Sequence, residues 1–426
     1  MSTATNLVRR RLLARGAGAL AAAGLGGACA QTTPAAQPAA APAPAAAPPA
    51  AAAPAATPAA ASGAKPLPPY VAWKDANAMI VHTATTIETK RTAFGSSLIT
   101  PADRLYIRNN LPAPDVSIVA DRDGWPIVIE GVRQPRTLKV AELKSLGLET
   151  TAMVLQCSGN GRSYFPTKPS GTKWTVGAAG CLLWSGVPVR AVVQALGGLA
   201  DGVRFMTGTG GEKLPDGVDP KTVMVERSVP LKAMEDALLA WEMNGEPVPH
   251  AHGGPLRLIV PGYSGVNNVK YIKRLVFTQT ETDAAIQKTG YRMSPPGQKG
   301  DPSQPSVWEM DVKSWINSPA PEAGPVRAGL VQIHGVAMGG MNAAARVEVS
   351  TDGGKTWKDA RLIGPDLGRY AWRQFVLPVQ LAPGTYVLAS RAADAKGNVQ
   401  VEATPDNGGG YLNSGWRVHA LQITVV

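Results

Sequence analysis

The pattern of apolar and polar residues divides the chain into two regions of different character. Residues 70–295 mix short strand-like runs with helical spacings, which indicates an α+β domain. Residues 31–66 that precede it are nearly all Ala and Pro, so this segment predicts a disordered linker with nothing large to bury. The pattern predicts strands at 105–108, 125–130, 202–206 and 255–260, short helices at 140–146 and 187–196, and an apolar stripe at 231–243.

The composition changes after a Pro/Gly/Ser-rich stretch at residues 294–306. Residues 305–426 carry short alternating runs separated by turn clusters such as Asp352-Gly-Gly354 and Lys396-Gly-Asn398. This spacing is typical of an all-β sandwich, and we expect an immunoglobulin-like domain. The alternating runs are 331–337, 345–350, 370–377, 385–391 and 417–425.

The N-terminal segment has the pattern of an export signal. Arg9-Arg-Arg11 opens a basic stretch, a weakly apolar Gly/Ala run follows, and Ala28-Cys-Ala30 is a small-x-small cleavage pattern. Residues 1–30 therefore predict a twin-arginine signal peptide and a periplasmic protein. A lipoprotein cleaved before Cys29 is the alternative, although Gly26 stands where an aliphatic residue is expected. Since this route carries folded proteins, it favours an enzyme whose cofactor is inserted before export.

Composition narrows the classes of function. The chain has 426 residues, of which 44% are hydrophobic and 17% charged, with a formal net charge of +11. Four arginines lie in the predicted signal peptide, so the remainder is only mildly basic. No Lys/Arg run interleaved with aromatic residues follows, which argues against nucleic-acid binding, and no segment reaches the ~18 apolar residues that a membrane span requires. An anionic substrate or an acidic partner fits better.

Cys157 is the strongest candidate for chemistry. It follows an apolar strand-like run, lies in a Gly/Asn turn and precedes Arg162 by five residues. A thiolate is a soft metal ligand, a nearby arginine lowers a thiol pKa, and Gly159 and Gly161 let the backbone approach a bulky group closely. A disulfide with Cys181, or two inert core thiols, are the alternatives that the residues leave open.

Other loops carry donors that suit an anion. Arg108-Asn-Asn110 follows a predicted strand, His252 and Arg257 flank a tight turn, and the Gly/Asn-rich loop 261–270 ends in Lys270. Each alone is also an ordinary turn; together with a thiol they describe a pocket for a large anionic cofactor with a soft-ligated metal. Zinc is disfavoured, because His250 and His252 have no convincing third ligand.

These motifs resemble the sulfite oxidase family of molybdopterin enzymes, and they occur in that family's order. The similarity spans about residues 75–426 and implies a molybdopterin-binding domain followed by an immunoglobulin-like domain of the kind that often mediates dimerisation. The matching segments are Arg108-Asn-Asn110, Gln156-Cys-Ser-Gly-Asn-Gly-Arg162, Trp184-Ser-Gly-Val-Pro188, Trp241-Glu-Met-Asn-Gly-Glu246, His252-Gly-Gly-Pro-Leu-Arg257, Asn267-Asn-Val-Lys-Tyr271 and Ser350-Thr-Asp-Gly-Gly-Lys-Thr-Trp357.

The resemblance also implies roles for single residues. Cys157 would be the protein's thiolate ligand to molybdenum, which leaves Cys181 as a buried structural thiol. Arg108 and Arg162 would face the substrate, Trp174 would be a pocket tryptophan, and Tyr291 would be the active-site tyrosine. The residues implied to hold the pterin and its phosphate are Tyr106, Arg108, Asn109, Asn110, His252, Arg257, Asn268, Val269 and Lys270.

Two departures from the family's pattern bear on function. Animal and plant members have histidine where this chain has Asn110, an amide that keeps a donor but cannot be protonated. We also find no haem-binding segment, so the resemblance implies an external c-type cytochrome as electron acceptor.

The activity implied is oxidation of sulfite to sulfate. A sulfane-sulfur dehydrogenase of thiosulfate oxidation and a sulfoxide reductase are alternatives on the same fold. From another class comes a periplasmic binding protein with an adhesion module, which would hold no molybdenum. The sequence leaves open whether the chain is a monomer, a homodimer or a subunit of a cytochrome complex.

Overall fold

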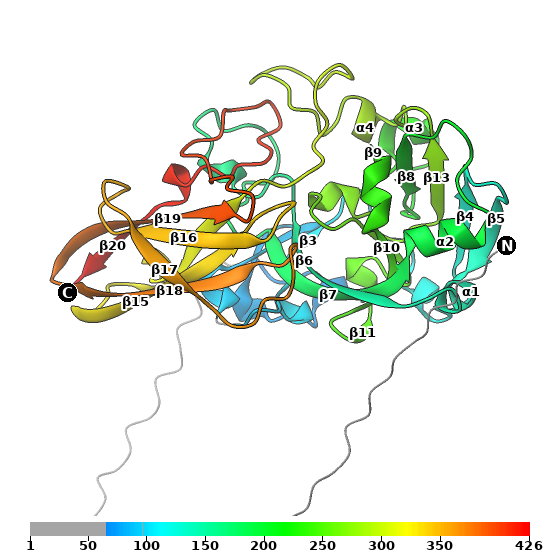
Figure 1. Cartoon of the computed structure of the whole chain (residues 1–426). Coiled ribbons are helices and arrows are strands. Elements are labelled where there is room, and N and C mark those ends of the chain that lie inside the picture. Colours follow the sequence, from blue (N-terminus) through cyan, green and yellow to red (C-terminus); the bar gives the residue numbers. More distant parts are fainter. Residues whose placement is uncertain (1–64, 96) are drawn as a thin grey trace, which may run out of the picture. The chain divides into compact units, whose positions relative to one another are not determined.

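The computed structural model describes residues 65–95 and 97–426, so the predicted signal peptide and almost all of the linker lie outside the described residues. Within the described part, strands dominate and are arranged in four sheets, with only short α-helices between them (Figure 1). None of the helices in residues 65–95 and 97–426 has the length and apolar character to cross a membrane.

One sheet positions the candidate cysteine. Its strands are β6 (Glu149–Gln156), β7 (Ala179–Pro188), β10 (Leu238–Met243), β11 (Glu246–Pro247) and β12 (Arg257–Ile259). They pair in the order β11-β10-β7-β6, and β12 also pairs with β10. Arg257 at the start of β12 pairs with Ala240 of β10, and both Arg257 and the turn that follows β6 line the same cavity.

The apolar run of β6 is continuous because both faces of the strand are buried. Met153 and Leu155 pack in one core cluster together with Cys157. Val154 points to the other side, where it packs with Trp315 and Trp372. Side chains alternate along a strand, so this register places Cys157 on the same face as Met153 and Leu155.

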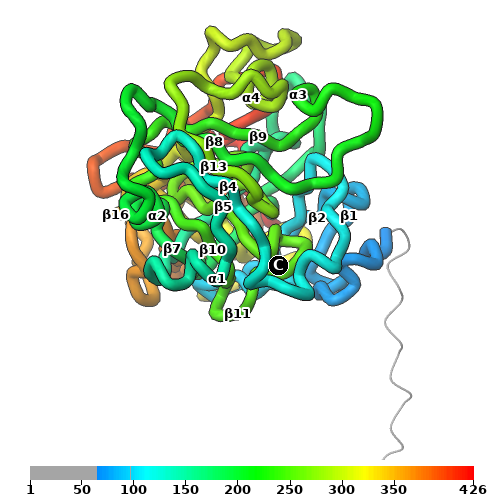
Figure 2. The backbone as a smooth tube through the Cα atoms, turned by 90° about the vertical axis from the view of Figure 1, so that its right-hand side faces the viewer, coloured from blue at the N-terminus to red at the C-terminus, as the bar shows by residue number. Residues whose placement is uncertain are grey.

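A second five-stranded sheet covers the other large core of the first domain. It has the order β5-β4-β13-β8-β9, in which β13 pairs in parallel with β4 and antiparallel with β8, and these strands lie side by side in Figure 2. Its strands are β4 (Pro126–Glu130), β5 (Arg136–Lys139), β8 (Phe205–Thr209), β9 (Glu226–Pro230) and β13 (Arg274–Thr278).

Smaller elements complete this domain. The Glu142 carboxylate accepts a hydrogen bond of 2.8 Å from the backbone N–H of Lys139, which caps the first turn of α1. The helices are α1 (Val140–Lys144), α2 (Val189–Ala195), α3 (Pro220–Val223) and α4 (Ala285–Lys288), and the small sheet consists of β1 (Met79–Thr83), β2 (Thr86–Thr89) and β3 (Ile107–Arg108).

The predicted α+β fold of this region is confirmed, with one element divided. The apolar stripe at 231–243 forms a 3₁₀ helix, Leu231–Glu235, followed by the strand β10. Asp236 lies between the two elements, and Ala237 donates its N–H to the Met234 carbonyl. The stripe is thus apolar because both elements face buried cores, although only its first part is helical.

The C-terminal region is mostly β, as predicted. Its strands are β14 (Lys313–Ser318), β15 (Gly329–Met338), β16 (Ala344–Ser350), β17 (Lys358–Ile363), β18 (Arg373–Leu381), β19 (Gly384–Asp394) and β20 (Leu421–Val425). Hydrogen bonds connect them in the order β14-β15-β18-β17-β16-β19-β20. Ser314 of β14 lies 3.0 Å from Ser390 of β19, hydroxyl to hydroxyl, so the sheet folds over a common apolar core.

Candidate active site

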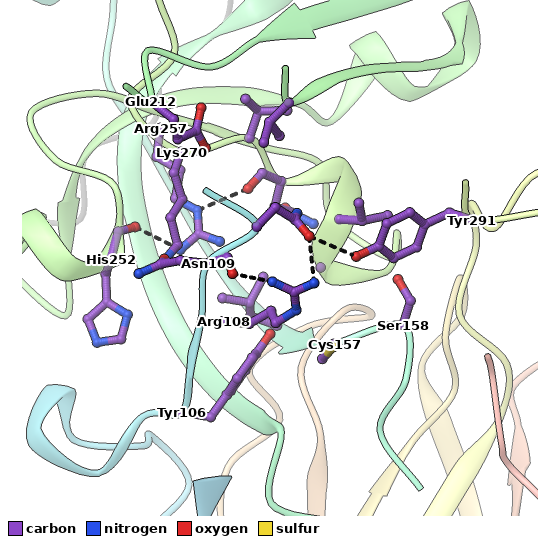
Figure 3. A pocket seen from close by; sticks show the side chains of 17 residues that line it. Tyr106, Arg108, Asn109, Cys157, Ser158, Glu212, His252, Arg257, Lys270 and Tyr291 are labelled. Carbon is purple, nitrogen blue, oxygen red and sulfur yellow. Dashed lines mark hydrogen bonds between the residues drawn. The ribbon is translucent and has the colours of Figure 1, made fainter. Parts of the chain in front are cut away.

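Two cavities meet at Cys157. All nine residues predicted to hold the pterin line a narrow inner cavity. Arg162 lines an outer cavity of about 500 Å³. The residues that line both are Arg108, Asn109, Asn110, Cys157 and Tyr291. Figure 3 shows Cys157 and Tyr291 on one side of the inner cavity and the cationic residues Arg257 and Lys270 on the other, with Arg108 between them.

The thiol of Cys157 is free and fixed by its backbone. Its N–H donates to the carbonyl of Ala178 at 2.9 Å, and its carbonyl accepts from Asn160 at 2.9 Å. Cys181 is also free and is fully buried, and this burial raises the pKa of its thiol to about 12. The disulfide alternative is therefore excluded, and only Cys157 of the two thiols opens into a cavity.

Glycines allow Arg162 to fold back beside the cysteine. A Cβ atom on Gly159 would lie 2.4 Å from Nη2 of Arg162, so a larger residue there would displace the guanidinium. Nε of Arg162 donates to the Gly409 carbonyl at 2.9 Å and Nη1 to the Thr172 carbonyl at 3.0 Å. The guanidinium is thus held at the wall of the outer cavity by a nearby loop at Thr172 and by a loop of the second domain at Gly409.

Asn110 connects the predicted substrate arginine with the predicted tyrosine. Its Oδ1 accepts a hydrogen bond from Nη2 of Arg108 at 2.6 Å and from the Tyr291 hydroxyl at 3.4 Å. Tyr291 has a φ of 50°, a left-handed conformation that is uncommon for a non-glycine residue and often occurs at functional sites. In this geometry the Asn110 amide acts as an acceptor, whereas the sequence suggested a donor.

The far end of the inner cavity is strongly cationic. Nζ of Lys270 donates to Asn109 Oδ1 at 2.6 Å and to the Ala251 carbonyl at 2.7 Å, and Nη1 of Arg257 donates to the His252 carbonyl at 2.8 Å. Burial, together with the nearby Arg257, lowers the pKa of Lys270 well below its ordinary value, and burial lowers that of Arg257 to about 10. A lysine whose charged form is disfavoured by burial and by a neighbouring arginine is suited to an anionic ligand.

Three residues at the site were missed in the sequence. Glu212 lines the inner cavity, and burial raises the pKa of its carboxyl to about 7; its Oε2 has no partner within the described residues. Nζ of Lys74 lies 3.1 Å from Nε2 of His252. Tyr411 comes from the second domain and lines the outer cavity. All three reach the site through tertiary contacts, and none belongs to a local motif.

Trp174 does not lie where the resemblance implied. It is fully buried, lines neither cavity, and makes edge-on contacts with Tyr106 at 6.3 Å and His82 at 5.2 Å between ring centroids. Tyr106 lines the inner cavity, so this edge-on contact of Trp174 supports a side chain of the cavity wall. Asn268 and Val269 line the inner cavity, but the Asn268 amide is used within its own loop, where Oδ1 accepts from Val260 N–H at 2.8 Å.

The residues present fit a molybdopterin cofactor. Gly265 lines the inner cavity and lets its loop pack closely against the wall, because a Cβ atom there would lie 2.9 Å from the Gln156 carbonyl oxygen and 3.1 Å from the Tyr106 hydroxyl. The cationic end suits a phosphate, and the unpartnered Glu212 oxygen can accept N–H donors of a heterocycle. No cluster of three or more His, Cys, Asp or Glu that could bind a metal occurs in the part of the chain that the structure describes. A metal at Cys157 would thus take its other ligands from the cofactor.

A buried lysine behind the cysteine loop makes the stability depend on pH. Lys313 is 1% exposed and its Nζ donates to the Asn160 carbonyl at 3.3 Å. Burial lowers its pKa to about 7, partly opposed by Asp311. The unfolded chain therefore binds the extra proton between about pH 7 and pH 10, and the free energy of unfolding should rise with pH in this window.

We expect the Lys313→Met variant to reduce this rise by up to about 1.4 kcal/mol per pH unit. Denaturant unfolding at pH 7 and pH 9 of the wild type and the variant measures the difference. Equal dependence on pH in both proteins would show that Lys313 does not carry it.

Comparisons with known proteins agree with this site. The family model of the oxidoreductase molybdopterin-binding domain matches residues 112–286, and that of the Mo-co oxidoreductase dimerisation domain matches residues 304–424. Fold and site therefore define a molybdopterin oxidoreductase.

Curated relatives narrow this class. Sulfite oxidase of Gallus gallus is 32% identical over 338 residues, which cover 75% of this chain and 72% of the relative, and that of Arabidopsis thaliana is 31% identical over 366 residues, 79% and 91% respectively. The chain belongs to the sulfite oxidase family. The crystal structure of the sulfane dehydrogenase SoxCD from Paracoccus pantotrophus is also similar, with a TM-score of 0.68 and 26% identity, covering 81% of this chain and 89% of that one.

Proposed function

We propose that this protein oxidises sulfite to sulfate by oxygen-atom transfer. Sulfite and water would give sulfate, two protons and two electrons, and the electrons would pass to an external c-type cytochrome. The observation that supports this most directly is the free Cys157 thiol at the junction of a cationic inner cavity and an outer cavity with two arginines. The bound molybdenum cofactor would supply the oxygen transfer and the two-electron redox chemistry.

The chain's own residues would bind and orient the substrate. Guanidinium groups bind oxyanions through charge-assisted hydrogen bonds, so Arg108 and Arg162 would hold the sulfite oxygens and leave the sulfur directed toward the metal end of the site. Asn110 would maintain this arrangement, because its Oδ1 bonds both Arg108 and Tyr291. Arg257, Lys270 and His252 would hold the cofactor's phosphate end.

Loss of either substrate arginine should weaken sulfite binding. We expect Arg108→Gln and Arg162→Gln each to raise the KM for sulfite by about 10- to 100-fold, because one charge-assisted hydrogen bond contributes roughly 1.5–3 kcal/mol. Steady-state kinetics with ferricyanide as acceptor measure this, and the exposed Arg133→Gln is the control. An unchanged KM in both variants would contradict the role of the arginines.

A sulfane-sulfur dehydrogenase is the second candidate. It is favoured by the similarity to the SoxCD structure, which extends over 89% of that chain. Reduction of cytochrome c or ferricyanide with sulfite, compared with thiosulfate, separates the two activities, and reductive turnover of methionine sulfoxide tests the reductase alternative. Turnover of thiosulfate without turnover of sulfite would overturn our first assignment.

The cellular context is part of the same proposal. The arginine-rich, Gly/Ala-rich N-terminal segment favours export to the periplasm by the twin-arginine route. The match to a dimerisation domain favours a homodimer. Fractionation of cells for the mature protein, and light scattering of the purified enzyme, test these two points.

A further inference from the structure

The second domain reaches into the outer cavity through a loop, residues 404–414, between β19 and β20. Three hydrogen bonds attach this loop to the turn that carries Cys157: Leu412 N–H donates to Ser158 at 2.8 Å, the Asn413 amide donates to the Gly161 carbonyl at 3.0 Å, and Gly409 accepts from Arg162 at 2.9 Å. The loop is therefore held at a fixed position relative to the turn that carries Cys157.

Tyr411 is the side chain that this loop delivers. Its ring stacks on Tyr291, with centroids 5.0 Å apart and planes 20° apart, and the Arg162 guanidinium carbon lies 5.5 Å from its centroid. Asn407 fixes its backbone in both directions, since the Asn407 amide donates to the Tyr411 carbonyl at 2.9 Å and its Oδ1 accepts from Tyr411 N–H at 2.8 Å. One ring thus contacts two residues of the predicted substrate site.

Two glycines in this loop make room for the Tyr411 ring and for Arg162. A Cβ atom on Gly409 would lie 2.0 Å from the Tyr411 ring, and one on Gly410, whose φ is +59°, would lie 2.7 Å from Cγ of Arg162. Only glycine at both positions lets the ring and the arginine occupy these places. Nε and Nη1 of Arg162 already donate to backbone carbonyls, and its guanidinium contacts the Tyr411 ring. The position in which Arg162 can meet a substrate is therefore restricted by both sets of contacts.

We propose that Tyr411 is a specificity-determining residue: its ring positions Tyr291 and Arg162 and so sets how strongly the outer cavity binds a small sulfur oxyanion. This rests on the proposed function only for the nature of the substrate. Aromatic stacking and a cation–π contact act through the ring, so a phenylalanine should replace the tyrosine and an aliphatic residue should not.

The test uses the molybdenum-loaded enzyme and inorganic sulfate as a probe of oxyanion binding. We expect Tyr411→Leu to raise two quantities by about tenfold: the Kd for sulfate, measured by calorimetry, and the KM for sulfite. A tenfold change equals about 1.4 kcal/mol. The turnover number should change by less than about threefold, because the ring does not touch the reacting atoms. Tyr411→Phe should stay within about twofold of the wild type, and Tyr386→Leu, on β19 of the same domain, is the control.

Three outcomes would overturn the proposal: unchanged sulfate binding in Tyr411→Leu, equal losses in Tyr411→Leu and Tyr411→Phe, or a fall in turnover number with KM unchanged. If Tyr411→Leu does not fold, Gly409→Ala decides by the same criteria, because its added methyl group displaces the ring from the other side. If the wild type does not oxidise sulfite, the proposed function fails, while sulfate binding by the variants still decides the role of Tyr411.

Discussion

Replacement of Cys157 by serine will abolish turnover while the chain still folds. Its thiol opens into both cavities, and a serine hydroxyl is a much poorer ligand for a soft-ligated metal. Loss of a partner that only supports a metal ligand already costs about 10–100-fold in affinity or activity, so loss of the ligand itself should cost more than about a hundredfold. Ferricyanide reduction with sulfite and molybdenum content per chain measure the two consequences.

Cys181→Ser is the matched control. Cys181 is a residue of β7 whose thiol is fully buried and lines neither cavity, so the change should leave molybdenum content and turnover within about twofold. Burial of a hydroxyl without a hydrogen bond costs about 1–3 kcal/mol. We therefore expect the free energy of unfolding of Cys181→Ser to fall by about this amount. Sulfite turnover retained by Cys157→Ser, or lost in Cys181→Ser with metal content preserved, would refute the assignment of the ligand.

The local sequence was sufficient to predict candidate site residues that lie in the turn directly after a strand. Cys157 could be predicted because β6 is buried on both faces and the glycines after it leave room for a bound group. The fold classes of both regions followed from their different periodicities. In the second region, strands β14 and β17 were missed, because β14 begins with Lys313 and Ser314, which are polar yet buried, and β17 is largely exposed.

The rest of the site depends on contacts between segments far apart in the chain. Arg162 and Gly409 are separated by 247 residues, and Lys74 and His252 by 178, so no local pattern announces either pair. Trp174 shows the opposite limit. Its motif position suggested the pocket, but the neighbouring Tyr106 lines the inner cavity and Trp174 does not, and only the tertiary structure decides which of the two aromatic residues forms the wall.

Replacement of Lys270 by methionine should separate cofactor binding from folding. Lys270 lies at the cationic end of the inner cavity, where it is part-buried near Arg257 and donates to Asn109. A phosphate there would be bound partly by this ammonium group, so we expect the molybdenum content of Lys270→Met to fall more than about tenfold. Exposed Lys273→Met, three residues further along, is the matched control and should retain its metal.

In cofactor-free protein, made by a host that cannot synthesise the cofactor, Lys270→Met should have little effect on stability. Without an anion, Lys270 is a part-buried group whose charged form is disfavoured by desolvation and by Arg257, so its removal relieves repulsion as well as losing two hydrogen bonds. We therefore expect the melting temperature of the cofactor-free variant to stay within about 4 °C of the cofactor-free wild type, since these two effects oppose one another. A large loss of stability in the cofactor-free variant would mean that Lys270 holds the fold, and metal loss could then no longer be attributed to a missing phosphate contact.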